Sequence, residues 1–258
     1  MQNHRTKNAT LFSQVTLKHG PVGVLGRTML LAEQLTRQVG VTLSFGTAED
    51  YLAANEANAD TWTPLISSLD ARFHSFDKTK SFFILGRNEA GDVVACQAGK
   101  FLEWDGTNFK DECESLRFLY SDPKSMKLPG ERWAISSLAA RGAGGRVAYS
   151  GAAWYRPDYR RKGLVEYLPR LSRALAKGLW DSEVTVTVMM EKNVKKGVFP
   201  RNGYRNMEWA IDATNGRQGN LRYAFLWTKT DEMVEDLEQF LSDLGPQRDA
   251  ALRAVSGE

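Results

Sequence analysis

The stretch that decides the fold reads Trp154-Tyr155-Arg156-Pro157-Asp158-Tyr159-Arg160-Arg161-Lys162-Gly163-Leu164-Val165-Glu166. The β-branched and aromatic residues over 147–155 predict a strand before it, which Pro157 ends. Leucines then recur at spacings of four, three, four and four, which predicts one apolar face of a long helix: Leu164, Leu168, Leu171, Leu175 and Leu179. A strand therefore passes through a short basic turn directly into a helix.

This basic turn has the chemistry of an anion site. The first N–H groups of a helix have no intrahelical acceptor and lie at the positive end of its dipole, so a phosphate fits there. Gly163 has no β-carbon, which would allow a pyrophosphate to approach the backbone, and Arg160, Arg161 and Lys162 would add positive charge. The alternative is a helix that begins with solvated cations. Each cation at a helix N-terminus destabilises the helix by roughly 0.3–1 kcal/mol, so an anion site is favoured over solvated cations.

On these residues the chain resembles the GNAT N-acetyltransferase superfamily. Its acyl-CoA motif is Arg/Gln-x-x-Gly-x-Gly/Ala after a strand and before a helix, and Arg160, Gly163 and Val165 occupy its three defining positions. Val165 stands where that family usually has a small residue. The order of predicted elements extends the resemblance from Val41 to about Thr228.

The resemblance implies an α/β fold with a mixed, mostly antiparallel central sheet flanked by helices. It also implies acetyl-CoA or another acyl-CoA as co-substrate, with direct attack by an amine and no covalent enzyme intermediate. Its cofactor-binding residues would be the strand edge, the turn and a post-strand asparagine: Trp154, Tyr155, Arg156, Arg160, Arg161, Lys162, Gly163, Leu164, Val165 and Asn193.

Acid and base residues are less clearly indicated. The resemblance places a tyrosine four residues before the Gly203-Tyr204 pair, but this chain has Phe199 there, which cannot donate a proton. Tyr204 is then a candidate acid, and the alternative is that it packs in the core. The candidate bases are Glu114, beside Glu112, and Glu191. Any of them could reach a cleft or be a solvated surface carboxylate.

The expected elements divide the chain into three parts. Residues 1–40 are expected to form an arm and helix, 41–229 the acyltransferase domain with an insertion or surface excursion at 105–145, and 230–258 a last helix and tail. Strands are expected over 41–45, 81–86, 93–98, 147–155, 184–188, 204–211 and 221–228. Helices are expected over 29–39, after a capping Thr47, and over 61–72, 164–179 and 230–244. The pair Gly245-Pro246 is expected to end the last helix. The apolar face of that helix would cover the chain's own core or a homodimer partner.

Composition excludes several classes. The 258 residues carry a net charge of +3, which does not call for a nucleic-acid partner, and no apolar run reaches membrane-spanning length. Cys96 and Cys113 cannot form a disulfide framework, and His4, His19 and His74 lack metal-ligand spacing, so no metal is expected. The start has no secretory signal, which predicts a reduced cytoplasmic protein.

The functional hypothesis is therefore an acyltransferase that moves an acetyl or longer acyl group to an amine of a small molecule or peptide. The alternative is a GNAT-like module that binds CoA without turnover, because Phe199 replaces the acid and the strand over 147–155 carries no carboxylate.

Overall fold

A single eight-stranded sheet organises the chain. The computed structural model describes residues 11–256, with side chains described to residue 244. The strand order is β1-β2-β3-β5-β6-β8-β7-β4, and every neighbouring pair is antiparallel except β5 and β6. The strands are β1 (Thr42–Gly46), β2 (Ser81–Arg87), β3 (Val93–Trp104), β4 (Arg132–Ile135), β5 (Gly145–Tyr155), β6 (Val184–Met190), β7 (Asn206–Gly216) and β8 (Gly219–Lys229). The predicted fold class, a mixed and mostly antiparallel sheet flanked by helices, is confirmed.

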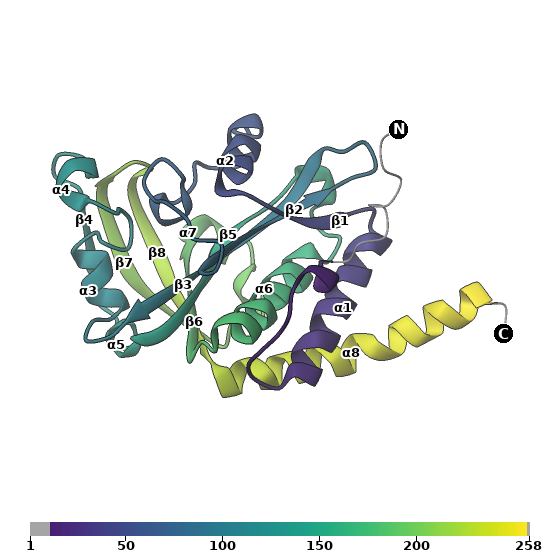
Figure 1. The fold of residues 1–258 in the computed structure, drawn as a ribbon. Coiled ribbons are helices and arrows are strands. Elements are labelled where there is room, and N and C mark those ends of the chain that lie inside the picture. Colours follow the sequence, from purple (N-terminus) through teal and green to yellow (C-terminus); the bar gives the residue numbers. More distant parts are fainter. Residues whose placement is uncertain (1–10, 257–258) are drawn as a thin grey trace.

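Helices cover both faces of this sheet (Figure 1). The long helices α1 (Val22–Gln38), α6 (Leu164–Trp180) and α8 (Thr230–Ser256) share one apolar core with one face. The other face packs against shorter helices and the segment between α2 and β2. These shorter helices are α2 (Ala48–Ala57), α3 (Phe109–Glu114), α4 (Pro123–Met126) and α5 (Leu138–Gly142). The helix α7 (Glu191–Lys195) belongs to a separate small cluster, in which Val194 packs near Met189 and Tyr204.

The α6 helix follows the predicted leucine pattern. Leu164, Leu168, Leu171 and Leu175 are all buried against the sheet, as their spacing predicts. The fifth leucine, Leu179, is only partly buried, and it packs against the same cluster. The position of α6 directly after β5 fixes where the basic turn lies.

Three expectations about local structure are wrong. Residues 61–72 form no α-helix, but only a 3-10 turn at Ser67–Leu69, because Trp62, Leu65 and Leu69 are buried individually along an irregular path and Pro64 disfavours helical backbone before it. The 105–145 stretch is not a surface excursion. Its helices are too short to leave a periodic pattern, and its strand β4 forms the sheet edge beside β7.

The last helix continues past Gly245-Pro246 to Ser256. A proline removes one backbone N–H donor and disfavours helical backbone in the residue before it, but its own φ is compatible with a helix. Residues 1–10 of the expected arm, including His4, lie outside the described residues.

The parallel pair β5–β6 separates along its length. The two strands pair only at Val147 with Val184, Ala148 with Thr185, and Tyr149 with Val186. Beyond Tyr149, β5 continues to Tyr155 and β6 to Met190 without pairing with each other. One edge of β5 is therefore open over residues 150–155.

Candidate functional site: a cavity at the strand separation

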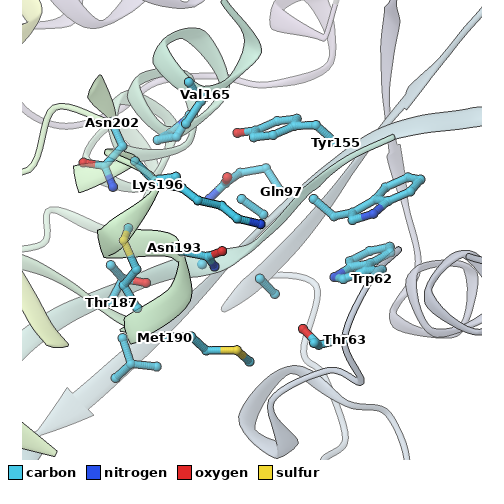
Figure 2. A pocket seen from close by; sticks show the side chains of 18 of the residues that line it. Trp62, Thr63, Gln97, Tyr155, Val165, Thr187, Met190, Asn193, Lys196 and Asn202 are labelled. Carbon is cyan, nitrogen blue, oxygen red and sulfur yellow. The ribbon is translucent and has the colours of Figure 1, made fainter. Parts of the chain in front are cut away.

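A cavity of about 840 Å³ lies where β5 and β6 separate. Its walls come from the open half of β5, the turn that begins α6, the end of β6 with the residues after it, and the loop over residues 60–66. Figure 2 shows Gln97 of β3 directed into this space, and Asn193 of α7 and the C-cap residue Lys196 of the same helix directed into it from another side. Its volume is in the range of sites for small molecules and cofactors.

A β-bulge at the separation re-aims the backbone of β5. Cys96 pairs with Trp154 and Ala98 with Gly151, so Ala152 and Ala153 lie opposite the single residue Gln97. Ala152 has a φ of 51°, a left-handed conformation that is rare outside glycine. Bulges of this kind bend a strand and are common beside active sites.

Gln97 leaves one buried polar atom without a partner. Its Nε2 donates to Ser150 Oγ at 3.1 Å, and that oxygen lies 2.8 Å from Ser172 Oγ on α6. Its Oε1 has no hydrogen-bond partner although the residue is only 1% exposed. A buried carbonyl without a donor costs about 1–3 kcal/mol, so this cavity-lining residue is suited to accept an N–H from a ligand.

The turn before α6 has the predicted free donors. The backbone N–H groups of residues 161–165 donate no hydrogen bond to another described residue. They lie at the N-terminus of a 17-residue helix, where they and the helix dipole favour an anion. Arg161, Leu164 and Val165 of this turn line the cavity.

The cations of this segment point in different directions. Arg160 and Arg161 line the cavity. The Arg160 side chain also donates to the backbone oxygens of Tyr155 at 3.0 Å and Thr61 at 3.4 Å, which ties the turn to the 60–66 loop. Lys162 does not line the cavity; its Nζ lies 4.3 Å from the ring centre of Tyr159.

Arg156 and Gly163 also lie apart from the cavity surface. Arg156 pairs with Asp92 and Asp158. A β-carbon on Gly163 would lie 2.3 Å from the ring of Tyr167, so this glycine makes room for a side chain of the protein. Its φ of 81° is the second reason for glycine at this helix start. The expectation that Gly163 opens space for a pyrophosphate is therefore replaced by a conformational and packing role.

The other predicted cofactor residues come together here: Trp154, Tyr155 and Asn193 line the cavity together with the turn. Sequence reasoning missed three cations on the opposite wall, Lys192, Lys196 and Arg201. Their clustering after β6 is visible in the sequence as a basic run around 192–201. Arg201 pairs with Glu166 at 2.8 Å, across the mouth of the turn.

The acid and base candidates are distributed differently. Tyr204 lines the cavity, and its hydroxyl donates to the backbone oxygens of Ser150 on β5 at 3.2 Å and Val186 on β6 at 3.4 Å. It therefore bridges the two strands where they begin to separate. Burial raises the pKa of Tyr204 to about 12, so it stays protonated near neutral pH.

None of the candidate glutamates lines the cavity in the described part of the chain. Glu114 pairs with Lys110 and accepts from the backbone N–H of Ile135, on the β4 side of the sheet. Glu191 pairs with Lys195 at 2.8 Å. Glu112 is bound by Arg117.

Aromatic side chains form the wall opposite the turn. Trp62 and Trp154 stack with ring centres 5.0 Å apart and 7° between their planes. The loop that carries Trp62 is held on its other side by Gln218, which donates to the backbone oxygen of Pro64. The cavity is thus bounded by a loop that is tied to both the turn and the β7–β8 hairpin.

Comparison with known proteins gives matches only among solved structures. No protein-family model and no curated protein matches the chain. NAA60 from Arabidopsis thaliana in complex with acetyl-CoA is 7% identical, with 74% of this chain and 99% of that chain covered and a TM-score of 0.45.

A second match is the spermidine N-acetyltransferase of Vibrio cholerae in complex with CoA and spermine. It is 8% identical, with 76% of this chain and 99% of that chain covered and a TM-score of 0.42.

Within residues 11–256, no group of three His, Cys, Asp or Glu side chains could hold a metal ion. No helix in this range is long and apolar enough to cross a membrane.

Proposed function

We propose that the chain binds an acyl-CoA in the cavity between β5 and β6 and transfers its acyl group to an amine. The observation that carries this proposal is the open strand edge leading to five unbonded backbone N–H groups at the start of α6. A thioester with a long amide-containing arm and a diphosphate requires this combination of a strand-like edge and an anion site.

The residues present fit such a co-substrate. Alternate residues of a strand direct their N–H and C=O groups to the same side, so the open half of β5 can pair with the amides of the arm. Gln97 Oε1 would supply a further buried acceptor. The diphosphate would lie against the amides of residues 161–165 with Arg161 beside it, and Lys192 and Lys196 would face it from the other wall.

The reaction would proceed by direct attack. The amine nitrogen forms a bond to the thioester carbonyl carbon, the carbon–sulfur bond breaks, and CoA leaves as the thiolate. A backbone N–H on the open edge of β5 would stabilise the negative charge that develops on the carbonyl oxygen. Because ordinary thiols have a pKa of about 8.5, the thiolate can leave and be protonated from water, and Phe199 need not be replaced by another acid.

Calorimetry with acetyl-CoA, combined with a thiol-release assay over an amine panel, tests this proposal. Binding with one site per chain and amine-dependent release of free CoA are expected. Absence of acetyl-CoA binding to the full chain contradicts the proposal.

The alternative, a CoA-binding module without turnover, is favoured by the lack of a glutamate or histidine among the described residues that line the cavity. Tight binding without thiol release from any amine would support that alternative. A cytoplasmic location, a homodimer, the absence of nucleic-acid and membrane partners, and the division at residues 40 and 229 remain predictions from the sequence.

A further inference from the structure

The cavity joins two chemically different ends. At the α6 side, the turn over residues 160–165 is cationic and has unbonded amides. Across the strand separation, the wall belongs to the apolar core on the other face of the sheet. This second end, which we call the aromatic end, is lined by Trp62, Leu65, Tyr149, Trp154, Met190 and Tyr223. With the acyl-CoA arm along β5, as proposed above, the aromatic end is where the acceptor would lie.

The charges around the cavity disfavour a cationic acceptor. Five cations line it: Arg160, Arg161, Lys192, Lys196 and Arg201. Among the described lining residues, Asp60 is the one acid, and it is exposed. Arg201 is paired with Glu166. Arg161, Lys192 and Lys196 would face the diphosphate, so the missing partner is decisive: an alkylammonium ion would find no buried carboxylate to pair with among the described lining residues.

Apart from the exposed Asp60, the described residues that line the cavity include no carboxylate or histidine that could remove a proton. An alkylamine with a pKa near 10.4, as in lysine, is unprotonated in only roughly one molecule in 2,000 at pH 7. Enzymes that use such amines need a positioned base to remove the proton. Tyr149 and Tyr204, which reach the strand separation, are buried, and burial raises the pKa of both hydroxyls, so they are not bases at neutral pH.

We infer that the acceptor is an aromatic amine, with its nitrogen attached directly to the ring. The inference rests on the proposed acyl-CoA-dependent function. The lone pair of such a nitrogen is delocalised into the ring, so the amine is uncharged at neutral pH and needs no base before attack. Its ring matches the stacked Trp62–Trp154 wall, where aromatic pairs contribute about 0.5–1.5 kcal/mol beyond burial.

The step balances without a further reactant. The neutral nitrogen attacks the thioester carbon, and the carbon–sulfur bond breaks with its electron pair on sulfur. The nitrogen, now cationic, loses its proton to water, and the thiolate takes up a proton from water. The products are the N-aryl amide and free CoA.

Aniline and benzylamine are matched probes, because they share the ring and differ in whether the nitrogen is a neutral aryl amine or a protonated alkylamine at pH 7. Thiol release with acetyl-CoA should give a kcat/KM for aniline at least about tenfold above that for benzylamine, with spermidine lower still. From pH 7 to 9, kcat/KM should stay level for aniline and rise about tenfold per pH unit for benzylamine. A preference for benzylamine or spermidine at pH 7, or no use of aniline by a chain that binds acetyl-CoA, overturns the inference.

A pair of variants at the aromatic end tests the charge argument. Thr63, on the loop beside Trp62, lines the cavity (Figure 2). Thr63→Glu adds the missing carboxylate, and Thr63→Gln is its uncharged control of similar size. The aniline-to-benzylamine ratio should fall about tenfold further in Thr63→Glu than in Thr63→Gln. An equal ratio in the two variants contradicts the role assigned to charge.

Calorimetry with acetyl-CoA on the same preparations distinguishes a failure of the proposed function from a failure of the inference about the acceptor. If acetyl-CoA does not bind, the proposed function fails and this inference fails with it. If acetyl-CoA binds and the amine preference is reversed, the inference about the acceptor alone fails.

Discussion

Two adjacent cations in the turn before α6 provide a test of the site that depends on geometry and not on overall charge. Arg161 lines the cavity, whereas Lys162 does not and lies over the ring of Tyr159 at 4.3 Å. Replacing either by alanine removes one positive charge from nearly the same place in the chain. Both variants keep a β-carbon, so Arg161→Ala leaves the cost of its left-handed backbone, φ 63°, unchanged.

The expected effect follows from one charge-assisted contact to a phosphate. Such hydrogen bonds contribute about 1.5–3 kcal/mol, and because Arg161 is exposed in the free protein the lower value applies. A loss of about 1.5 kcal/mol weakens the acetyl-CoA Kd roughly tenfold. Lys162→Ala removes only a screened charge and should change Kd by less than about twofold.

Isothermal titration with acetyl-CoA at one fixed ionic strength measures both values. Circular dichroism melting checks that the two variants are folded equally well. Equal losses in the two variants, or no loss in Arg161→Ala, would refute the placement of the diphosphate in this turn.

Three further perturbations test the framework around the cavity. Asp236→Asn leaves the buried Arg173 without its counter-charge, so it should cost about 3–5 kcal/mol and lower Tm by about 6–20 °C in a thermal melt, whereas the exposed Glu235→Gln should change Tm by less than about 2 °C. A melting temperature for Asp236→Asn within that same 2 °C contradicts the buried pair. Tyr204→Phe removes the hydroxyl that bridges β5 and β6, and a loss of about 1–3 kcal/mol in urea unfolding is expected; unchanged stability would exclude the bridge. Burial lowers the pKa of His74 from 6.5 to about 4, so the unfolded chain takes up the proton first as pH falls, and stability present above pH 6.5 should decline toward pH 4. Urea unfolding over this range should show a shallower decline in His74→Gln, and an identical decline contradicts the assignment.

The location of the basic turn, the proposed anion site, could be predicted from the sequence because it depends on local order along the chain. A strand pattern, a basic turn and leucines at helical spacing specify β5, the turn and α6 without knowledge of any distant residue. The two closing strands and the parallel strand before them follow from the same kind of pattern. These elements carry the sequence-based expectation of a GNAT-like fold.

Which residues of this turn line the cavity could not be predicted in the same way. Arg161 and Lys162 are neighbours of like charge, and only packing against Tyr159 turns one of them away from the cavity. Gly163 looks like an opening for a ligand until Tyr167 is seen to fill that space. In an irregular turn no periodicity fixes the direction of a side chain, so long-range contacts decide it.

The sequence by itself determined the strand–turn–helix order at β5 and α6 and the position of the cationic turn, since both are encoded by residues close together in the chain. Only the tertiary structure decided the shape and chemistry of the cavity. It stacked Trp62 on Trp154, set Gln97 opposite the bulge at Ala152, and left the glutamates outside. These contacts join segments that are distant in the chain. They depend on the twist and packing of the whole sheet and not on any local sequence pattern.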